Sequence, residues 1–165
     1  MPRRPAGGNP VEELRVPIQQ IDVVVHTDRG QTLTGRLYLS EGRDIGATPF
    51  RVLELLDDDR EFLPFRTNDA HPRDIAINKD HIVRVRVATD GPMSVDDAMV
   101  DGHGSEECFS VVLSDGSSLR GRLAVTTPRA ASRLVDKLNN AGRFIPLVRD
   151  DSVELVHRRH VLSME

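Results

Sequence analysis

The sequence predicts a mainly β protein with short helices, organised as two tandem small β-barrels that arose by internal duplication. Three observations support this prediction. A glycine-containing segment recurs in the two halves of the 165-residue chain, apolar and polar residues alternate around it, and a Thr-Pro pair follows it in both halves. Such alternation is typical of half-buried strands, and a Thr-Pro pair is typical of a helix start.

The recurring segment keeps a constant offset of 86 residues, from 27 to 113. TDRGQTLTGRLYL (27–39) aligns with LSDGSSLRGRLAV (113–125). The matched pairs are Gly30 with Gly116, Leu33 with Leu119, Gly35 with Gly121, Arg36 with Arg122 and Leu37 with Leu123. The match predicts the same strand, tight turn and strand in both halves.

Two further blocks follow in the same order. REFLPFR (60–66) aligns with GRFIPLV (142–148), and IAINKDHIVRV (75–85) aligns with VELVHRRHVLSM (153–164). These blocks pair Phe62 with Phe144, Pro64 with Pro146, Ile75 and Ile77 with Val153 and Leu155, and, after one extra residue in the second copy, His81 with His160. The shared order of three blocks indicates a duplication.

Each half is expected to run as strand, tight turn, strand, short helix, strand and hairpin. Thr48-Pro49 and Thr127-Pro128 each place a capping threonine before a proline at the first helical position. The second helix should be the longer one, with Gly142 as its stop. Three acidic residues, Asp57, Asp58 and Asp59, follow the first helix, where we expect them to cap and turn the chain; an acidic patch for a basic partner is the alternative.

Glycine and proline mark special positions in the strands. Gly35 and Gly121 lie in the middle of the second strand, where the bend of a small barrel leaves no room for a Cβ atom. Pro64 and Pro146 cannot donate a ladder hydrogen bond, so their strand is expected to begin there or to run along an edge.

The charge distribution divides the chain. Residues 88–107 hold six acidic and no basic residues, whereas residues 108–165 hold nine basic and six acidic ones. The acidic segment has few large apolar residues and many turn formers. We therefore expect a flexible tail over 1–15, a first barrel repeat over 16–87, an acidic linker over 88–107 and a second barrel repeat over 108–165.

Composition excludes several classes of protein. The net charge of -4 argues against a polycation that coats nucleic acid. No run of 18 apolar residues is present, and no apolar segment follows the basic residues of 1–10, which argues against membrane and secreted proteins. The single cysteine, Cys108, cannot form an internal disulfide and is expected to start a buried strand. A cytoplasmic protein is expected.

The second half resembles an Sm-like barrel, including the bacterial Sm-like RNA chaperone. The resemblance rests on the motif V-x-L-x-x-G-x-x-L-x-G-x-L, which begins at Val111, and on His157-Arg158-Arg159-His160-Val161, which is similar to that chaperone's basic final hairpin. It covers about 40 residues of the second half and a similar stretch of the first, and SH3-like barrels share the same turn and glycine pattern. The resemblance implies a small five-stranded barrel and makes RNA binding the alternative function.

The chain departs from the Sm pattern in several places. A helix follows the second strand instead of preceding the first, Phe-x-Pro occupies the third strand, and the usual base-pocket residues are absent. The first copy's hairpin, Asn78-Lys79-Asp80-His81, is nearly neutral.

Arginine and histidine side chains are the candidate binding residues. Guanidinium and imidazole groups can meet an acidic protein surface, a phosphate or a stacked base. The aromatic content of 4%, with no Trp, favours a protein partner over RNA. The candidates are Arg120, Arg122, His157, Arg158, Arg159 and His160 in the second repeat, and Arg36 as the counterpart of Arg122.

Signs of catalysis or of a cofactor are missing. The sequence has no P-loop, dinucleotide fingerprint, G-x-S-x-G elbow or H-E-x-x-H motif. His157 and His160 lack a third metal ligand nearby, and the cluster of His103, Glu106, Glu107 and Cys108 has glycine-rich surroundings without fixed geometry. We therefore expect no metal and no cofactor.

These observations predict a non-enzymatic cytoplasmic adaptor or regulatory module that binds a protein. The alternative is an Sm-like RNA-binding protein that uses its basic second repeat. Exposed strand edges would also allow a homo-oligomer.

Overall fold

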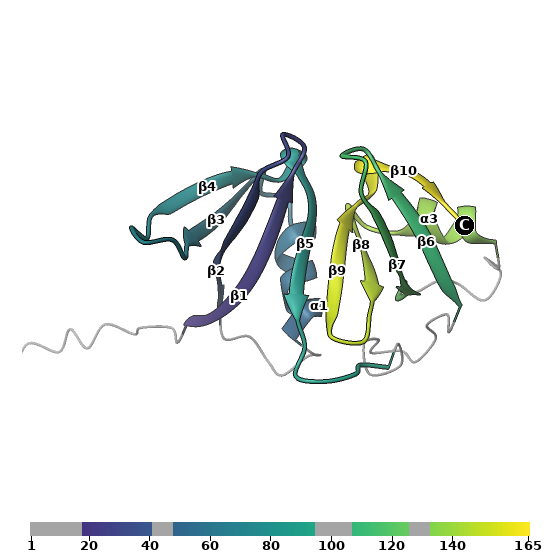
Figure 1. Ribbon diagram of the computed structural model, residues 1–165, viewed down its shortest axis with the longest axis horizontal. Helices are drawn as coiled ribbons and strands as arrows, with labels where there is room; N and C mark the ends of the chain where they lie inside the picture. The colour runs from purple at the N-terminus through teal and green to yellow at the C-terminus, as the bar shows by residue number, and fades with distance from the viewer. Residues whose placement is uncertain (1–17, 41–47, 95–106, 126–132) are drawn as a thin grey trace, which may run out of the picture.

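The computed structural model describes residues 18–40, 48–94, 107–125 and 133–165 (Figure 1). The described residues form ten antiparallel strands, two short α-helices and two single-turn 3-10 helices. The prediction of a mainly β protein with short helices is confirmed. Within these residues, no helix combines the length and the apolar character needed to cross a membrane.

The elements follow the same order twice. The first repeat contains β1 (Ile18–Thr27), β2 (Thr32–Ser40), α1 (Thr48–Asp57), β3 (Phe62–Thr67), β4 (Asp74–Asn78), η1 (Lys79–His81) and β5 (Ile82–Ala88). The second repeat contains β6 (Cys108–Leu113), β7 (Ser118–Leu123), α3 (Leu134–Asn140), β8 (Phe144–Val148), β9 (Ser152–His157), η2 (Arg158–His160) and β10 (Val161–Met164).

The ten strands make one continuous sheet in the order β10-β6-β7-β8-β9-β5-β1-β2-β3-β4. Each repeat supplies five neighbouring strands in the same internal order, and the two sets join where β5 pairs with β9. The sheet is open, with β4 at one end and β10 at the other (Figure 1). Two separate closed barrels are therefore not confirmed.

The tight turns of the two repeats match in detail. Gly30 and Gly116 both have a positive φ, of 72° and 81°, which a residue with a side chain rarely adopts. Each glycine N–H donates to the carbonyl of the last residue of the preceding strand, Thr27 or Leu113, at 3.0 Å. The Asp-Arg-Gly and Ser-Asp-Gly turns predicted from the sequence thus have one geometry.

The third block of the repeat aligns differently from the sequence expectation. The strand ladders place Phe62 opposite Asn78 and Phe144 opposite His157, so Asn78 corresponds to His157. Ile77 then corresponds to Val156, and not to Leu155 as the sequence alignment has it. The sequence alignment matched apolar residues with apolar residues, whereas the ladders give the buried Glu154 the position that Ile75 has in β4.

The helices are confirmed in part. Helix α1 begins at Thr48, as the Thr-Pro pair predicts. Helix α3 covers Leu134–Asn140, and the predicted start at Thr127-Pro128 lies outside the described residues. Gly142 follows the end of α3 by two residues, and a Cβ atom there would collide with the carboxylate of Asp57.

The proline prediction is wrong about the edge. Strand β3 lies between β2 and β4, and β8 lies between β7 and β9. The prolines are tolerated because β3 pairs with β2 only through its own last two residues, Arg66 and Thr67. Pro64 therefore has a strand partner on one side only, in β4. Pro146 is placed in the same way in β8.

The two repeats share their hydrophobic interior. The core cluster of the first repeat includes Phe144, Val153 and Leu155 from the second repeat. The core cluster of the second repeat includes Val83 from β5. Most of the predicted linker, residues 95–106, lies outside the described residues, so the predicted domain boundaries stay a prediction.

Candidate functional site

The seven predicted binding residues fall in three separate places. Arg36 lies on β2, Arg120 and Arg122 lie on β7, and His157 to His160 form the turn between β9 and β10. The first of these, Arg36, is an exposed residue whose Nε donates to Asp22 at 3.0 Å. It lies on the first repeat and is not brought together with the other six.

His157 is buried at the junction of the two repeats. Only 4% of the residue is exposed, and its ring packs edge-on against Phe144. Nδ1 accepts a hydrogen bond from the backbone N–H of Arg159, which caps η2, and Nε2 lies 3.9 Å from the carboxylate of Asp80. Burial and the neighbouring His160 lower the pKa of His157 to about 4, so the ring is neutral near pH 7.

The other three residues of the turn also make contacts within the protein. His160 connects Ser114, at 2.8 Å from Nδ1, to the backbone carbonyl of Asp80, at 3.0 Å from Nε2. Arg158 donates to the backbone carbonyls that end α3, and Arg159 lies 3.7 Å from the carboxylate of Asp80. The basic turn therefore acts first as a structural element, and only Arg158 and Arg159 are exposed.

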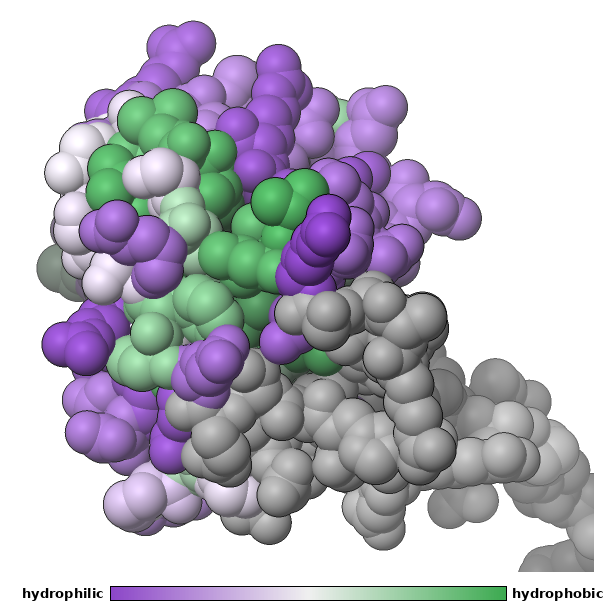
Figure 2. Space-filling model, turned by 90° about the vertical axis from the view of Figure 1, so that its right-hand side faces the viewer, coloured by the Kyte–Doolittle hydropathy of each residue, from purple (hydrophilic) through white to green (hydrophobic). Residues whose placement is uncertain are grey.

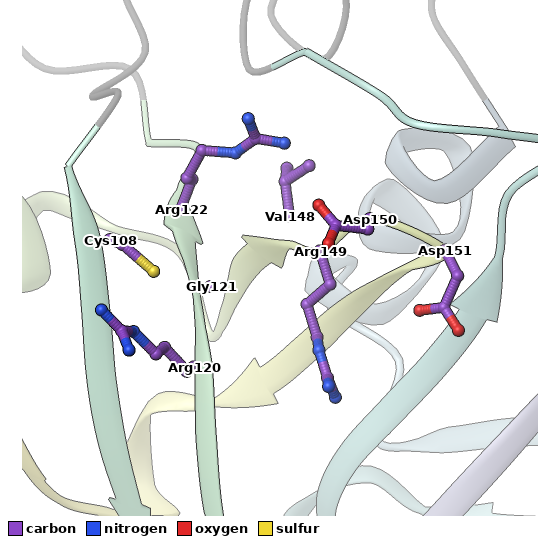
Figure 3. Close-up of a pocket in the computed structure, with 8 residues that line it drawn as sticks. All are labelled: Cys108, Arg120, Gly121, Arg122, Val148, Arg149, Asp150 and Asp151. Carbon is purple, nitrogen blue, oxygen red and sulfur yellow. The ribbon is translucent and has the colours of Figure 1, made fainter.

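Arg120 and Arg122 line an open pocket of about 650 Å³ at the ends of β6, β7 and β8. The lining also includes Cys108, Arg149, Asp150 and Asp151 (Figure 3). The guanidinium groups of Arg120, Arg122 and Arg149 point in different directions in Figure 3, and Arg122 donates to the carbonyl of Met93 at 2.9 Å. The three arginines do not converge on one anion site.

A buried ion pair connects the repeats across β5 and β9. Glu154 is fully buried, and Arg84 donates to its Oε2 at 2.9 Å. Arg86 and Arg149 lie 3.9 and 3.6 Å from Oε1 of the same carboxylate. Sequence reasoning did not single out Glu154, because nothing local to a lone acid in a strand reveals a partner on a distant strand.

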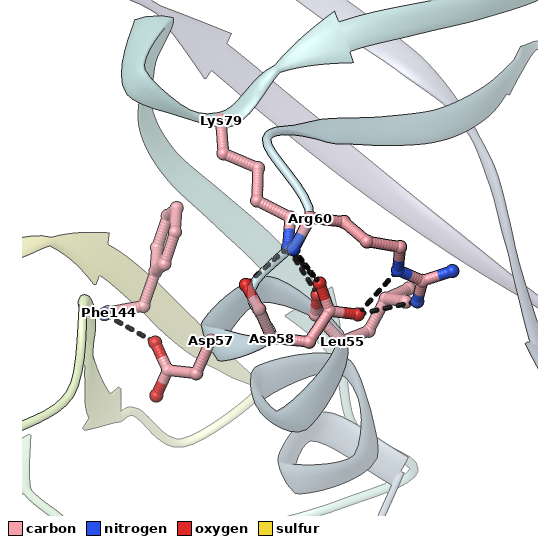
Figure 4. A network of polar contacts seen from close by, with 6 residues as sticks. All are labelled: Leu55, Asp57, Asp58, Arg60, Lys79 and Phe144. Atoms are coloured by element: carbon pink, nitrogen blue, oxygen red, sulfur yellow. Dashed lines mark hydrogen bonds and ion pairs between the residues drawn. The ribbon is translucent and has the colours of Figure 1, made fainter.

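Two of the three acidic residues at the end of α1, Asp57 and Asp58, make structural contacts, in agreement with the capping interpretation. Lys79 is buried, and its Nζ donates to the carboxylate of Asp58 at 2.7 Å and to the carbonyl of Leu55 at 2.8 Å (Figure 4). A second cation, Arg60, also donates to Asp58, and the contacts with Arg60 and Lys79 hold the pKa of Asp58 well below its usual range. Asp57 accepts from the backbone N–H of Phe144 at 2.9 Å.

The structure describes only part of the metal-ligand cluster considered from the sequence. The described residues include no group of three or more His, Cys, Asp or Glu side chains placed to hold a metal ion. Of the suggested cluster, His103 and Glu106 lie outside the described residues. Cys108 starts β6 as expected, but its side chain is exposed, and the strand turns Phe109 inward instead.

The two open edges of the sheet carry exposed apolar side chains. Phe62, on β3 beside β4, is 52% exposed. At the opposite end, Leu162 on β10 is 68% exposed and Val112 on the neighbouring β6 is 38% exposed. Figure 2 faces the β10 end and shows an apolar area there, bordered by polar residues. Sequence reasoning missed Phe62 and Leu162, because a phenylalanine or leucine in a strand is normally a core residue.

Comparisons with protein family models, with curated proteins and with solved structures found no match to this chain.

Proposed function

We propose that this protein is a non-enzymatic, cytoplasmic protein-binding module, built from two repeats of the small barrel type that arose by duplication, and that it binds through the open edges of its sheet. One observation supports the proposal above the others. Both end strands, β4 and β10, have an unpaired side, and each end of the sheet has an apolar residue that is more than half exposed: Phe62 on β3 beside β4, and Leu162 on β10.

An unpaired strand edge presents backbone N–H and C=O groups that another strand can satisfy. Proteins whose edge strands bind no partner usually cover these edges or place charged residues and bulges there. In β4 the middle residue Ala76 is exposed and uncharged, and β10 combines exposed Leu162 with exposed Ser163. The backbone would supply affinity and the apolar side chains would supply contact area.

RNA binding is the less well supported of the two candidate functions. An RNA surface needs free cations and exposed rings for stacking. The rings of His157 and His160 are buried, Arg158 bonds the end of α3, and Arg159 faces Asp80. These contacts reduce the cationic surface that the basic turn suggests in the sequence.

Site-specific photocrosslinking tests the proposal. A photoreactive residue is placed at Ala76 on β4 or at Ser163 on β10, with exposed Glu54 on α1 as the control position. We expect protein adducts from both edge positions in living cells, insensitive to nuclease, and none from position 54. Equal labelling at all three positions, or no protein adduct at either edge, would contradict edge binding. Nuclease-sensitive adducts would favour RNA.

A further inference from the structure

We infer that the partner of each open edge is the opposite edge of a second copy of this chain, so that β10 of one copy pairs antiparallel with β4 of the next. This inference rests on the proposed edge binding and names its partner. The template is the junction within the chain, where the last strand of the first repeat, β5, already pairs with β9. Strand β10 is the counterpart of β5, and β4 is the counterpart of β9.

The counterpart strands agree in detail. β5 pairs with β1 through a bulge that leaves Val83 without a partner, between Ile82 and Arg84. β10 pairs with β6 through the same irregularity, which leaves Leu162 without a partner, between Val161 and Ser163. The edge that β10 presents is therefore built like the edge that β5 uses to hold the second repeat.

The bulge residues show what the junction does. Val83 is fully buried and belongs to the hydrophobic core of the second repeat. Leu162 occupies the same position in β10 and is 68% exposed. A larger apolar side chain thus stands exposed where its counterpart inserts into a neighbouring repeat.

At the β4 edge, too, the exposed residue has a buried counterpart in the other repeat. Phe144, at the start of β8, is 1% exposed and packs in the core cluster of the first repeat. Phe62 is its counterpart at the start of β3 and is 52% exposed. Docking of β10 onto β4 would place Leu162 against the first repeat of the next copy and would cover Phe62. Both apolar exposures are explained by one missing neighbour.

A polar contact of the junction also has its two halves available. His160 bonds Ser114 through Nδ1 and reaches across the junction to the carbonyl of Asp80 through Nε2. Its counterpart His81 bonds Asp28 through Nδ1 at 2.8 Å and is exposed. In the proposed contact, His81 of the next copy donates through Nδ1 to Asp28 and through Nε2 to the carbonyl of Arg159 in the first copy, with a proton on both ring nitrogens; Arg159 is the counterpart of Asp80 in η2.

The partner must be a separate molecule. β4 and β10 lie at opposite ends of the open sheet (Figure 1), so one chain cannot join its own two edges. The proposed interface uses a different surface on each copy, and such an interface repeats until it closes into a ring or extends as a filament. In a ring and in a filament alike, the sheet of one copy would continue into the sheet of the next.

The template also sets the register. Within the chain, Arg84 lies opposite Val156 and Val85 lies opposite Leu155. The counterparts place Ser163 opposite Ile77 and Met164 opposite Ala76 of the next copy.

Sedimentation of the full chain and of edge variants tests the inference. We expect assemblies larger than a dimer that grow with protein concentration. Phe62→Lys and Leu162→Lys each block one edge and should weaken assembly by about tenfold or more in the dissociation constant. Both side chains are largely exposed, so folding should persist, which far-ultraviolet circular dichroism verifies. Thr34→Lys, at an exposed position on the inner strand β2, is the matched control and should assemble normally.

Mixing the two blocked variants decides the direction of pairing. Phe62→Lys keeps a usable β10 edge and Leu162→Lys keeps a usable β4 edge, so the mixture should form a heterodimer and nothing larger. A homodimer of either variant alone would indicate pairing of like edges and would overturn the head-to-tail arrangement. A wild-type chain that stays monomeric up to about 1 mM would overturn the inference itself.

Disulfide trapping tests the register and separates the inference from the proposed function. In a Cys108→Ser background, Ala76→Cys combined with Met164→Cys should give covalent oligomers on oxidation, because directly opposed strand residues lie within disulfide range. Either cysteine alone should give at most a dimer. If the wild-type chain is monomeric and photocrosslinking at Ala76 captures a different protein, self-pairing fails while edge binding stands.

Discussion

The carboxylate of Asp57 accepts a hydrogen bond from the backbone N–H of Phe144 at 2.9 Å, so the end of the first helix directly supports the start of a strand in the second repeat. Gly142 leaves the room that this carboxylate occupies. The aspartate that ends α1 is therefore part of the contact between the repeats.

Replacing Asp57 with Ala should destabilise the protein by about 1 to 2 kcal/mol, because the amide of Phe144 loses its acceptor. Asp57→Asn keeps an oxygen acceptor at this position. Burial disfavours the charged carboxylate of Asp57 and raises its pKa in the folded protein. This group therefore lowers the free energy of unfolding as pH rises through that pKa. The asparagine variant should thus be at least as stable as the wild type at pH 7. Urea unfolding of the three proteins measures the difference.

The two strand glycines should differ in their tolerance of a methyl group. In Gly35→Ala the new Cβ would meet the backbone carbonyl of Arg66 and lie 2.5 Å from the ring of Phe65. In Gly121→Ala the nearest atom, the carbonyl oxygen of Val148, is 3.0 Å away. We expect a loss on the order of 3 kcal/mol for Gly35→Ala and about 1 kcal/mol for Gly121→Ala. Equal unfolding midpoints in urea would contradict this ranking.

The buried ion pair should be costly to break and cheap to replace. Arg84→Met leaves the fully buried carboxylate of Glu154 with only the more distant Arg86 and Arg149, and we expect a loss on the order of 3 kcal/mol. The double variant Arg84→Met/Glu154→Leu removes both charges and should recover most of that loss. A double variant as unstable as Arg84→Met would show that the pair itself stabilises the junction.

Stability should fall as pH falls from about 6.5 to about 4, in part because of His157. Burial and the charges of His160, Arg143 and Arg159 lower its pKa to about 4 in the folded protein, and the carboxylate of Asp80 opposes this shift only in part. The unfolded chain therefore takes up a proton in this range while the folded protein does not, which costs about 3 kcal/mol across the range.

The first repeat supplies the control for this prediction. Asn78 caps η1 through its side-chain oxygen, as His157 caps η2 through Nδ1. His157→Asn should keep the cap and flatten the pH dependence of the unfolding free energy between pH 6.5 and 4. An unchanged slope would assign the dependence to other groups.

Arg36 and Arg122 occupy equivalent positions in the two repeats and should differ in how much they contribute to the free energy of unfolding. Arg36 pairs with an exposed aspartate, Asp22, so Arg36→Ala should change the free energy of unfolding by less than about 1 kcal/mol. Arg122 donates to the carbonyl of Met93 from a partly buried position, so Arg122→Ala should cost about 0.5 to 1.5 kcal/mol. Thermal melts of the two variants, run side by side, check the order.

Local features of the repeats were predictable from the sequence alone. The turn glycines Gly30 and Gly116, the alternation of the strands that flank them and the start of α1 at Thr48 all depend on backbone conformations that a few neighbouring residues determine. The internal repeat could be recognised for the same reason, because two segments that adopt the same local conformations have the same residues at those positions.

The tertiary structure alone decided which copy of each position is buried. Phe62 and Phe144 have nearly the same sequence surroundings, yet β8 packs against another repeat and β3 does not. His157 and Glu154 likewise owe their burial to the pairing of β5 with β9, which joins residues about 70 positions apart. Burial and ionisation depend on which strand edges meet, and local sequence patterns carry no information about partners that distant in the chain.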